Sequence, residues 1–253
     1  MATWVSHLII ADRVLAQRPR LDRRGFCAGS VAPDCNQENA DFTDFTPSRE
    51  TTHWMSVKGD KATADCAGFY RAYIESRIDE IQSAEEYAFL LGYWVHLITD
   101  VEFQRTLRDD EARVDAAWAR VLAHPALAEK AREMEKSWAS VKRLIPKEDR
   151  MKDIYAIEAE YLAAHPDSGY LTEILPLQSF PDYIDYLPKG AIVRKIGVVG
   201  YLPTAEESAY PFIALSREEY AAFLDRAEAL VTAALRRAVR FPEPPASQGQ
   251  NKT

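Results

Sequence analysis

The side chains of this chain that could do chemistry lie mostly in its first hundred positions. His96 and Asp100 stand four residues apart in the segment GYWVHLITD, Gly92 to Asp100. On an α-helix, residues i and i+4 share a face, so the imidazole and the carboxylate converge. An unpaired carboxylate in an apolar helix costs several kcal/mol, and a divalent metal held jointly with His96 offsets that cost. A polar pair in the core is the other interpretation of this motif.

Three more side chains occur in a similar context. His7 lies in the first predicted helix, Asp34 follows a turn in APDCN, and His53 follows a predicted loop in RETTHW. Imidazoles and carboxylates are the ligands that zinc and similar divalent ions bind. The predicted metal ligands are therefore His7, Asp34, His53, His96 and Asp100. The alternative is that each has an independent structural role.

Helices are expected to position these residues. Apolar residues surround His96 on nearly all sides, which predicts a buried central helix with Ser83 as its N-cap. Residues 26–32 are expected to form a short helix or turn, residues 36–48 a loop, and residues 190–202 a helix in preference to a strand. Further helices are predicted over 3–17, from Asp60 or Thr63 to about Ile78, from Asp109 to His124, from Pro125 to about Leu144, over 148–164, and from Ser216 to about Val239.

Composition limits the class of protein. The chain has 47% hydrophobic and 28% charged residues, as in soluble globular proteins. Its net charge of -8 argues against binding to nucleic-acid polymers or anionic membranes, but not against a small phosphorylated molecule. No apolar run reaches the ~18–20 residues that span a bilayer. We predict a single all-α domain over residues 1–240 and a disordered tail over residues 241–253, which are rich in Pro, Gln and Asn.

Cysteine usage and the N-terminus bear on location. Cys27, Cys35 and Cys66 are odd in number and form no C-x-x-C pair, which favours a reducing compartment. The first residues lack the pattern of a signal peptide. We therefore expect a cytoplasmic protein, in which Cys35 is a small buried hydrophobic residue.

The order of four motifs points to a family. H-L-x-I, A-P-D, T-H-W and G-Y-x-V-H-L-x-T-D together resemble the zinc-dependent phospholipase C family, which is related in fold to the S1/P1-type nucleases. The segments SHLIIADR and F-x-x-G-S-V-A-P-D resemble its small, signal-less bacterial branch. The similarity in motifs covers residues 1–105, and the resemblance implies a multi-helix domain of the phospholipase C/P1-nuclease type.

The resemblance also implies an arrangement of metals. Asp34, His53, His96 and Asp100 would surround one ion, and Asp100 would bridge to a second ion held by His7. In secreted members an N-terminal tryptophan completes that second site through its amino group and carbonyl. Trp4 holds this place here, but its nitrogen is not a free amine. Trinuclear members add two histidines and a glutamate shortly downstream, whereas this chain has no histidine between His96 and His124, so a third site of that kind is absent.

The chemistry expected from such a site is metal-assisted hydrolysis. One or two zinc ions, or another divalent metal, would activate water and bind a phosphoryl group. Asp34 and Asp100 are the predicted catalytic carboxylates, and Asp34 would take the proton from that water or orient it. Arg49 is a candidate clamp for the anionic substrate, or else a solvated loop residue. Trp54 is a candidate for the substrate pocket, or else a core residue.

Two functions therefore remain open. The first is a phosphoesterase that acts on a small-molecule phosphate ester, with the Pro- and Tyr-rich segment 166–215 capping its pocket. The second is a non-catalytic binding or assembly module, in which one structural zinc ties the first helix to the central helix. His124 and His165, each followed by proline at a helix end, are expected to be structural.

Overall fold

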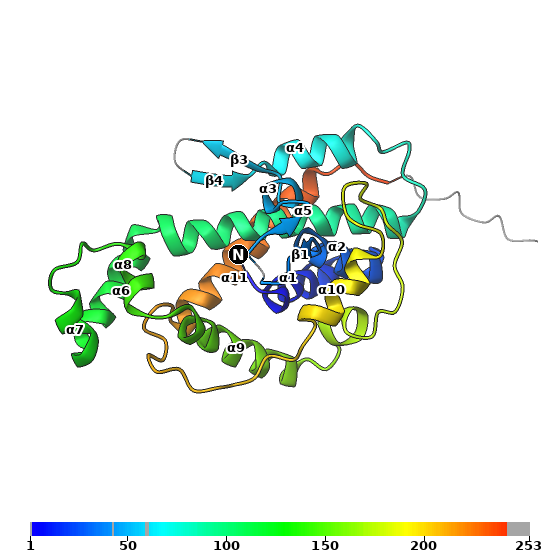
Figure 1. The fold of residues 1–253 in the computed structure, drawn as a ribbon. Coiled ribbons are helices and arrows are strands. Elements are labelled where there is room, and N and C mark those ends of the chain that lie inside the picture. The colour runs from blue at the N-terminus through cyan, green and yellow to red at the C-terminus, as the bar shows by residue number, and fades with distance from the viewer. Residues whose placement is uncertain (1, 42, 59–60, 242–253) are drawn as a thin grey trace, which may run out of the picture.

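The computed structural model describes residues 2–41, 43–58 and 61–241, and helices make up most of it (Figure 1). Within these ranges the strands form only two short hairpins. The predicted all-α class is thus confirmed. The expected tail, 241–253, lies outside the described residues except for Phe241.

The predicted central helix is α5, Ala84–Gln104, and its N-cap is Ser83 as expected, since the Ser83 hydroxyl accepts a hydrogen bond from the Glu86 amide at 3.0 Å. Most of its residues are buried, on all sides of the helix. The helices α1 (Trp4–Gln17), α2 (Arg23–Val31) and α11 (Arg217–Arg237) pack against it. Burial on all sides explains why its sequence is apolar nearly all round.

Glycines bring the backbones of α2 and α5 into contact. A Cβ atom on Gly29 would lie 2.0 Å from the carbonyl oxygen of Phe89, and one on Gly92 would lie 2.2 Å from that of Phe26. Gly25 makes a similar approach to Glu85, where the distance would be 2.3 Å. No larger residue fits at these positions, so the two helices lie at a fixed, short separation.

The segment between α2 and α5 contains two short hairpins where a loop and the start of a helix were expected. After the 3₁₀ turn η1 (Ala32–Asp34), the predicted loop 36–48 contains a hairpin of β1 (Gln37–Glu38) and β2 (Phe45–Thr46). The one-turn helix α3 (Arg49–Thr52) follows, then the hairpin of β3 (Met55–Lys58) and β4 (Lys61–Ala64).

A helix start at Asp60 or Thr63 was therefore the wrong prediction. The helix α4 begins at Cys66 and spans Cys66–Tyr70, because the Asp65 carboxylate accepts the Gly68 amide at 2.9 Å and caps it. It continues as the π-turn η2, Arg71–Glu75.

The second half of the chain contains further helices joined by irregular segments. After η3 (Arg105–Asp109) come α6 (Glu111–Ala123) and α7 (Pro125–Ala131), divided at His124–Pro125 as predicted. The helix expected to reach Leu144 is interrupted, because Ser137 caps a separate helix, α8 (Trp138–Leu144). The remaining elements are α9 (Lys147–Ala164), η4 (Tyr170–Ile174) and α10 (Ala191–Val199), and α10 confirms the helix expected over 190–202.

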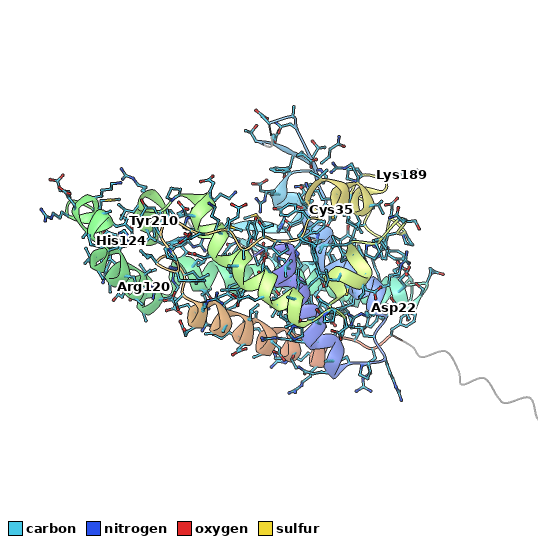
Figure 2. All side chains as sticks on the ribbon, turned by 90° about the horizontal axis from the view of Figure 1, so that it is seen from below. Asp22, Cys35, Arg120, His124, Lys189 and Tyr210 are labelled. Atoms are coloured by element: carbon cyan, nitrogen blue, oxygen red, sulfur yellow. The ribbon has the colours of Figure 1, made fainter. Side chains whose placement is uncertain are left out.

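The buried apolar residues form two clusters. The larger is built around α5, and the smaller joins α6, α7 and α8 to residues 213 and 214. Figure 2 shows the smaller cluster at one end of the molecule, where His124 lies beside Tyr210 with ring centroids 5.5 Å apart. None of the helices in the described ranges is both long and apolar enough to cross a bilayer.

Candidate metal centre

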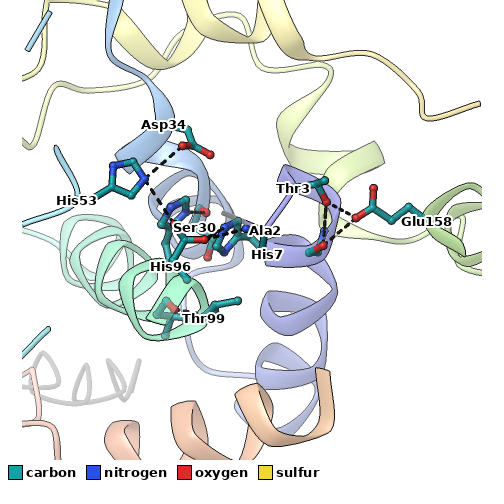
Figure 3. Close-up of polar contacts among 12 residues, drawn as sticks. Ala2, Thr3, His7, Ser30, Asp34, His53, His96, Thr99 and Glu158 are labelled. Atoms are coloured by element: carbon teal, nitrogen blue, oxygen red, sulfur yellow. Dashed lines mark hydrogen bonds and ion pairs between the residues drawn. The ribbon is translucent and has the colours of Figure 1, made fainter. Parts of the chain in front are cut away.

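The five predicted ligands meet at one buried place, although they come from four elements. His7 lies on α1, Asp34 ends η1, His53 follows α3, and His96 and Asp100 lie on α5. Their ligand atoms form two groups, each within 4.8 Å: His7, His96 and Asp100, and Asp34, His53 and His96. Figure 3 shows the three imidazoles facing one another, with Asp34 beside His53.

The two groups have His96 in common and lie side by side. The His7 and His96 rings are stacked, with centroids 3.7 Å apart. Asp100 faces both groups, since its Oδ1 lies 3.5 Å from His7 Nε2 and its Oδ2 lies 3.8 Å from His53 Nε2. On the far side, Asp34 Oδ1 lies 3.3 Å from His53 Nε2. This geometry is compatible with one ion in either group or one in each, with Asp100 between them.

Two hydrogen bonds orient the imidazoles. The carbonyl oxygen of Ser30 lies 2.8 Å from His96 Nδ1 and accepts a hydrogen bond from it. The Thr52 hydroxyl lies 3.0 Å from His53 Nδ1. In both rings the Nε2 atom is left to face the centre, as is typical of histidines whose second nitrogen binds a metal.

Several of the facing atoms have no hydrogen-bond partner. Burying such atoms without a partner costs free energy, because their hydration is lost. Cations bound in the two groups would satisfy most of these atoms, so the donor set fits a zinc-type ion. Among the five predicted ligands, the buried atoms without a hydrogen-bond partner are both nitrogens of His7, Nε2 of His53, Nε2 of His96 and Oδ2 of Asp100.

The protonation states suit metal binding. Burial, together with the neighbouring His7, lowers the pKa of His96 to about 3, so this ring is neutral at physiological pH. Burial alone would raise the pKa of Asp34 and Asp100, but the close approach of His53 to Asp34 and of His7 to Asp100 favours the ionised carboxylates and outweighs it. Both pKa values therefore lie well below the usual range. Neutral imidazole and ionised carboxylate are the forms that bind metals.

The backbone of Ala2 is a neighbour that the sequence did not reveal. Its amide nitrogen donates to Asp100 Oδ1 at 2.9 Å, and the residue is buried. Trp4, expected to hold the place of the family's N-terminal tryptophan, lies in the first turn of α1 and lines the adjacent pocket. The backbone nitrogen that reaches Asp100 is thus that of Ala2.

A pocket of about 340 Å³ opens beside Asp34. Arg49, the predicted anion clamp, lines it. Residues of the segment 166–215 form part of its wall, in agreement with the cap predicted there. They are Tyr170, Lys195, Val199, Tyr201 and Pro203.

Trp54, the other substrate candidate, lies elsewhere. Its ring makes edge contacts with Phe69 and Tyr73, and its Nε1 donates to the Tyr186 hydroxyl at 3.1 Å. It is not among the residues that line the pocket beside Asp34. Trp54 therefore packs in the aromatic core.

The remaining histidines and cysteines lie apart from the ligand groups. His124 caps the junction of α6 and α7, and His165 Nδ1 donates to the carbonyl oxygen of Tyr161 at 2.8 Å. Cys35 is fully buried, and burial raises the pKa of its thiol, as expected for a small hydrophobic residue. The free cysteines are Cys27, Cys35 and Cys66.

These observations define a class of protein, in which an all-α scaffold surrounds a centre of histidines and aspartates. Residues 6–102 match the model of the family described as zinc dependent phospholipase C, which confirms the resemblance over this part of the chain. All five ligands lie within the match, whereas α6 to α11 lie beyond it. No curated protein and no solved structure shows a significant match to the chain. The family match and the ligand groups together support a zinc-dependent hydrolase.

Proposed function

We propose that this protein is a zinc-dependent phosphoesterase whose metal centre consists of His7, Asp34, His53, His96 and Asp100. The observation that carries the proposal is the convergence of five candidate ligands, four of them buried and several with unpaired donor atoms, beside a pocket that Asp34 lines. A zinc ion bound there would acidify a water molecule and withdraw charge from a phosphoryl group.

The residues of the chain then have distinct tasks. Asp34 lines the pocket, and its side chain is 15% exposed, so its carboxylate would orient the attacking water or take its proton. Asp100, 2% exposed, holds its position between the two histidine groups. Arg49, at the pocket wall, binds the phosphoryl oxygens through its planar guanidinium group.

The alternative is a structural zinc that ties α1 to α5 in a binding or assembly module. A closed shell of four protein ligands would favour that role, whereas an open coordination position favours catalysis. The opening of Asp34 onto a pocket argues for catalysis, because a purely structural ion needs no access to solvent.

Metal content and turnover separate these functions. Wild type is expected to bind at least one zinc ion per chain by mass spectrometry, and to hydrolyse a generic phosphodiester. Asp100→Ala should lose both properties, whereas Asp115→Asn, at an exposed ion pair with Lys136, should keep them. Less than one metal ion per chain would contradict both functions. Stoichiometric zinc without turnover of any phosphate ester would favour the structural alternative.

A further inference from the structure

The pocket beside Asp34 has a polar end that the proposed centre does not use. Glu158 of α9 lines the pocket and is fully buried, with 0% of its surface exposed. Its Oε1 accepts hydrogen bonds from the hydroxyl groups of Thr3, Ser6 at 2.8 Å and Tyr220 at 3.2 Å. Its Oε2 has no partner. In Figure 3 every dashed contact of Glu158 ends on one oxygen.

A second buried polar atom in the same pocket is unpaired. Asn36 is 3% exposed, and its side-chain Nδ2 has no hydrogen-bond partner. The backbone carbonyl oxygen of Asn36 accepts hydrogen bonds from Arg194 and Lys195, both at 2.9 Å, so the backbone of this residue is held in place. Unpaired polar atoms are rare inside proteins, and a polar ligand in this cavity would satisfy both of them.

Aromatic side chains form part of the pocket wall. Trp4, Phe45, Tyr155 and Tyr201 line the pocket together with the aliphatic Val199. Such walls accept a short carbon chain, and the few polar atoms then fix its orientation. The pocket thus has a centre for the phosphoryl group at Asp34 and a hydrogen-bonding site at Glu158.

We propose that Glu158 is a specificity-determining residue whose free Oε2 binds a hydroxyl or ammonium group on the alcohol portion of the phosphate ester. This inference rests on the proposed phosphoesterase function. An acceptor oxygen without a partner selects a hydrogen-bond donor, and a ligand without that donor leaves the oxygen unsatisfied. Burial raises the pKa of Glu158 to about 7, so the carboxyl group meets the ligand in either protonation state near neutral pH.

Binding of three ligand series tests this role without turnover. The series are alkyl phosphates, ω-hydroxyalkyl phosphates and ω-aminoalkyl phosphates of two to six carbons, titrated calorimetrically into the zinc-loaded protein. Wild type is expected to bind the best hydroxyalkyl or aminoalkyl member about tenfold more tightly than the alkyl phosphate of equal length. The series that binds more tightly shows whether the ligand group that donates to Glu158 is a hydroxyl or an ammonium group.

Two variants make the test specific. Glu158→Met removes both oxygens and should abolish the preference. Glu158→Gln keeps an acceptor for Thr3, Ser6 and Tyr220, and should lose the preference for the amine in particular. Glu160→Gln, an exposed neighbour on α9, should behave as wild type. Equal binding of the three series by wild type, or a preference that survives in a folded Glu158→Met, would overturn the proposal. Failure of wild type to bind any of the phosphates would contradict the proposed phosphoesterase function. The role of Glu158 and the phosphoesterase function are therefore overturned by different results.

Discussion

His96 Nδ1 lies 2.8 Å from the carbonyl oxygen of Ser30, and this contact joins the metal centre to the packing of α2 against α5. The two residues are 66 positions apart in the chain. They meet because Gly29, next to Ser30, and Gly92, one turn before His96, let the backbones touch. The orientation of the His96 ring therefore depends on two residues that have no functional group.

Substituting these glycines is expected to damage both the fold and the centre. Gly29→Ala and Gly92→Ala each place a Cβ atom within 2.2 Å of a backbone oxygen, so the helices must separate. We expect losses of about 3 kcal/mol or more in the free energy of unfolding, measured with urea. Gly197→Ala on α10 is the matched control, because nothing lies within 4 Å of its Cβ position. It should be neutral or stabilising by up to ~1 kcal/mol, and equal effects at all three positions would refute this account.

The hydrogen bond to His53 is expected to tune zinc affinity. Thr52→Val removes the hydroxyl that lies 3.0 Å from His53 Nδ1 while keeping the shape of this fully buried side chain. Because the ring then loses its orienting partner, zinc affinity should fall about tenfold in a competition titration with a chelator. Thr51→Val, one residue earlier and exposed, should leave the affinity unchanged. An unchanged affinity in Thr52→Val would show that packing alone orients His53.

Arg49 is expected to act on substrate and not on metal. Arg49→Ala should lower kcat/KM for a phosphodiester by roughly ten- to a hundredfold, because a charge-assisted contact to the phosphoryl oxygens is lost. Zinc content should stay at the wild-type level. The control is Arg71→Ala, an exposed arginine of η2 that does not line the pocket. Unaltered kinetics in Arg49→Ala would identify Arg49 as a solvated loop residue.

Glu158 is expected to make stability depend on pH. Its pKa is about 7 in the folded protein and 4.5 ordinarily, so the folded state holds the proton more tightly than the unfolded state. Its contribution to stability is therefore full below pH 4.5 and is lost as the pH rises through 7. Relative to wild type, Glu158→Gln should gain on the order of 2 kcal/mol in unfolding free energy between pH 5 and pH 8.

This pH dependence is best measured by urea denaturation with a chelator present, so that metal binding makes no contribution. Other titrating groups are common to both proteins and cancel in the difference. Glu160→Gln, on the exposed side of α9, should show no such trend. A difference between Glu158→Gln and wild type that stays constant with pH would mean that Glu158 titrates normally.

The sequence alone determined the features that depend on neighbouring residues. The spacing of His96 and Asp100 placed them on one helical face, and Ser83 and Ser216 marked the starts of α5 and α11. The residue types, together with the order of four short motifs, singled out the five predicted ligands that the structure brings together. Local patterns fail where local preference is weak, as at residues 55–58 and 61–64, which pair as strands before Asp65 caps the helix.

Tertiary structure alone decided which residues surround the ligands. Trp54, beside a ligand in the chain, lies in an aromatic cluster away from the pocket, whereas Glu158 reaches the pocket. Glu158 meets Thr3 across 155 positions, and Ala2 meets Asp100 across 98. No periodicity encodes such contacts, because they arise only when helices from distant parts of the chain pack around the same core. The sequence thus identified the side chains that meet at the candidate metal centre, and packing decided the shape and polarity of the pocket beside them.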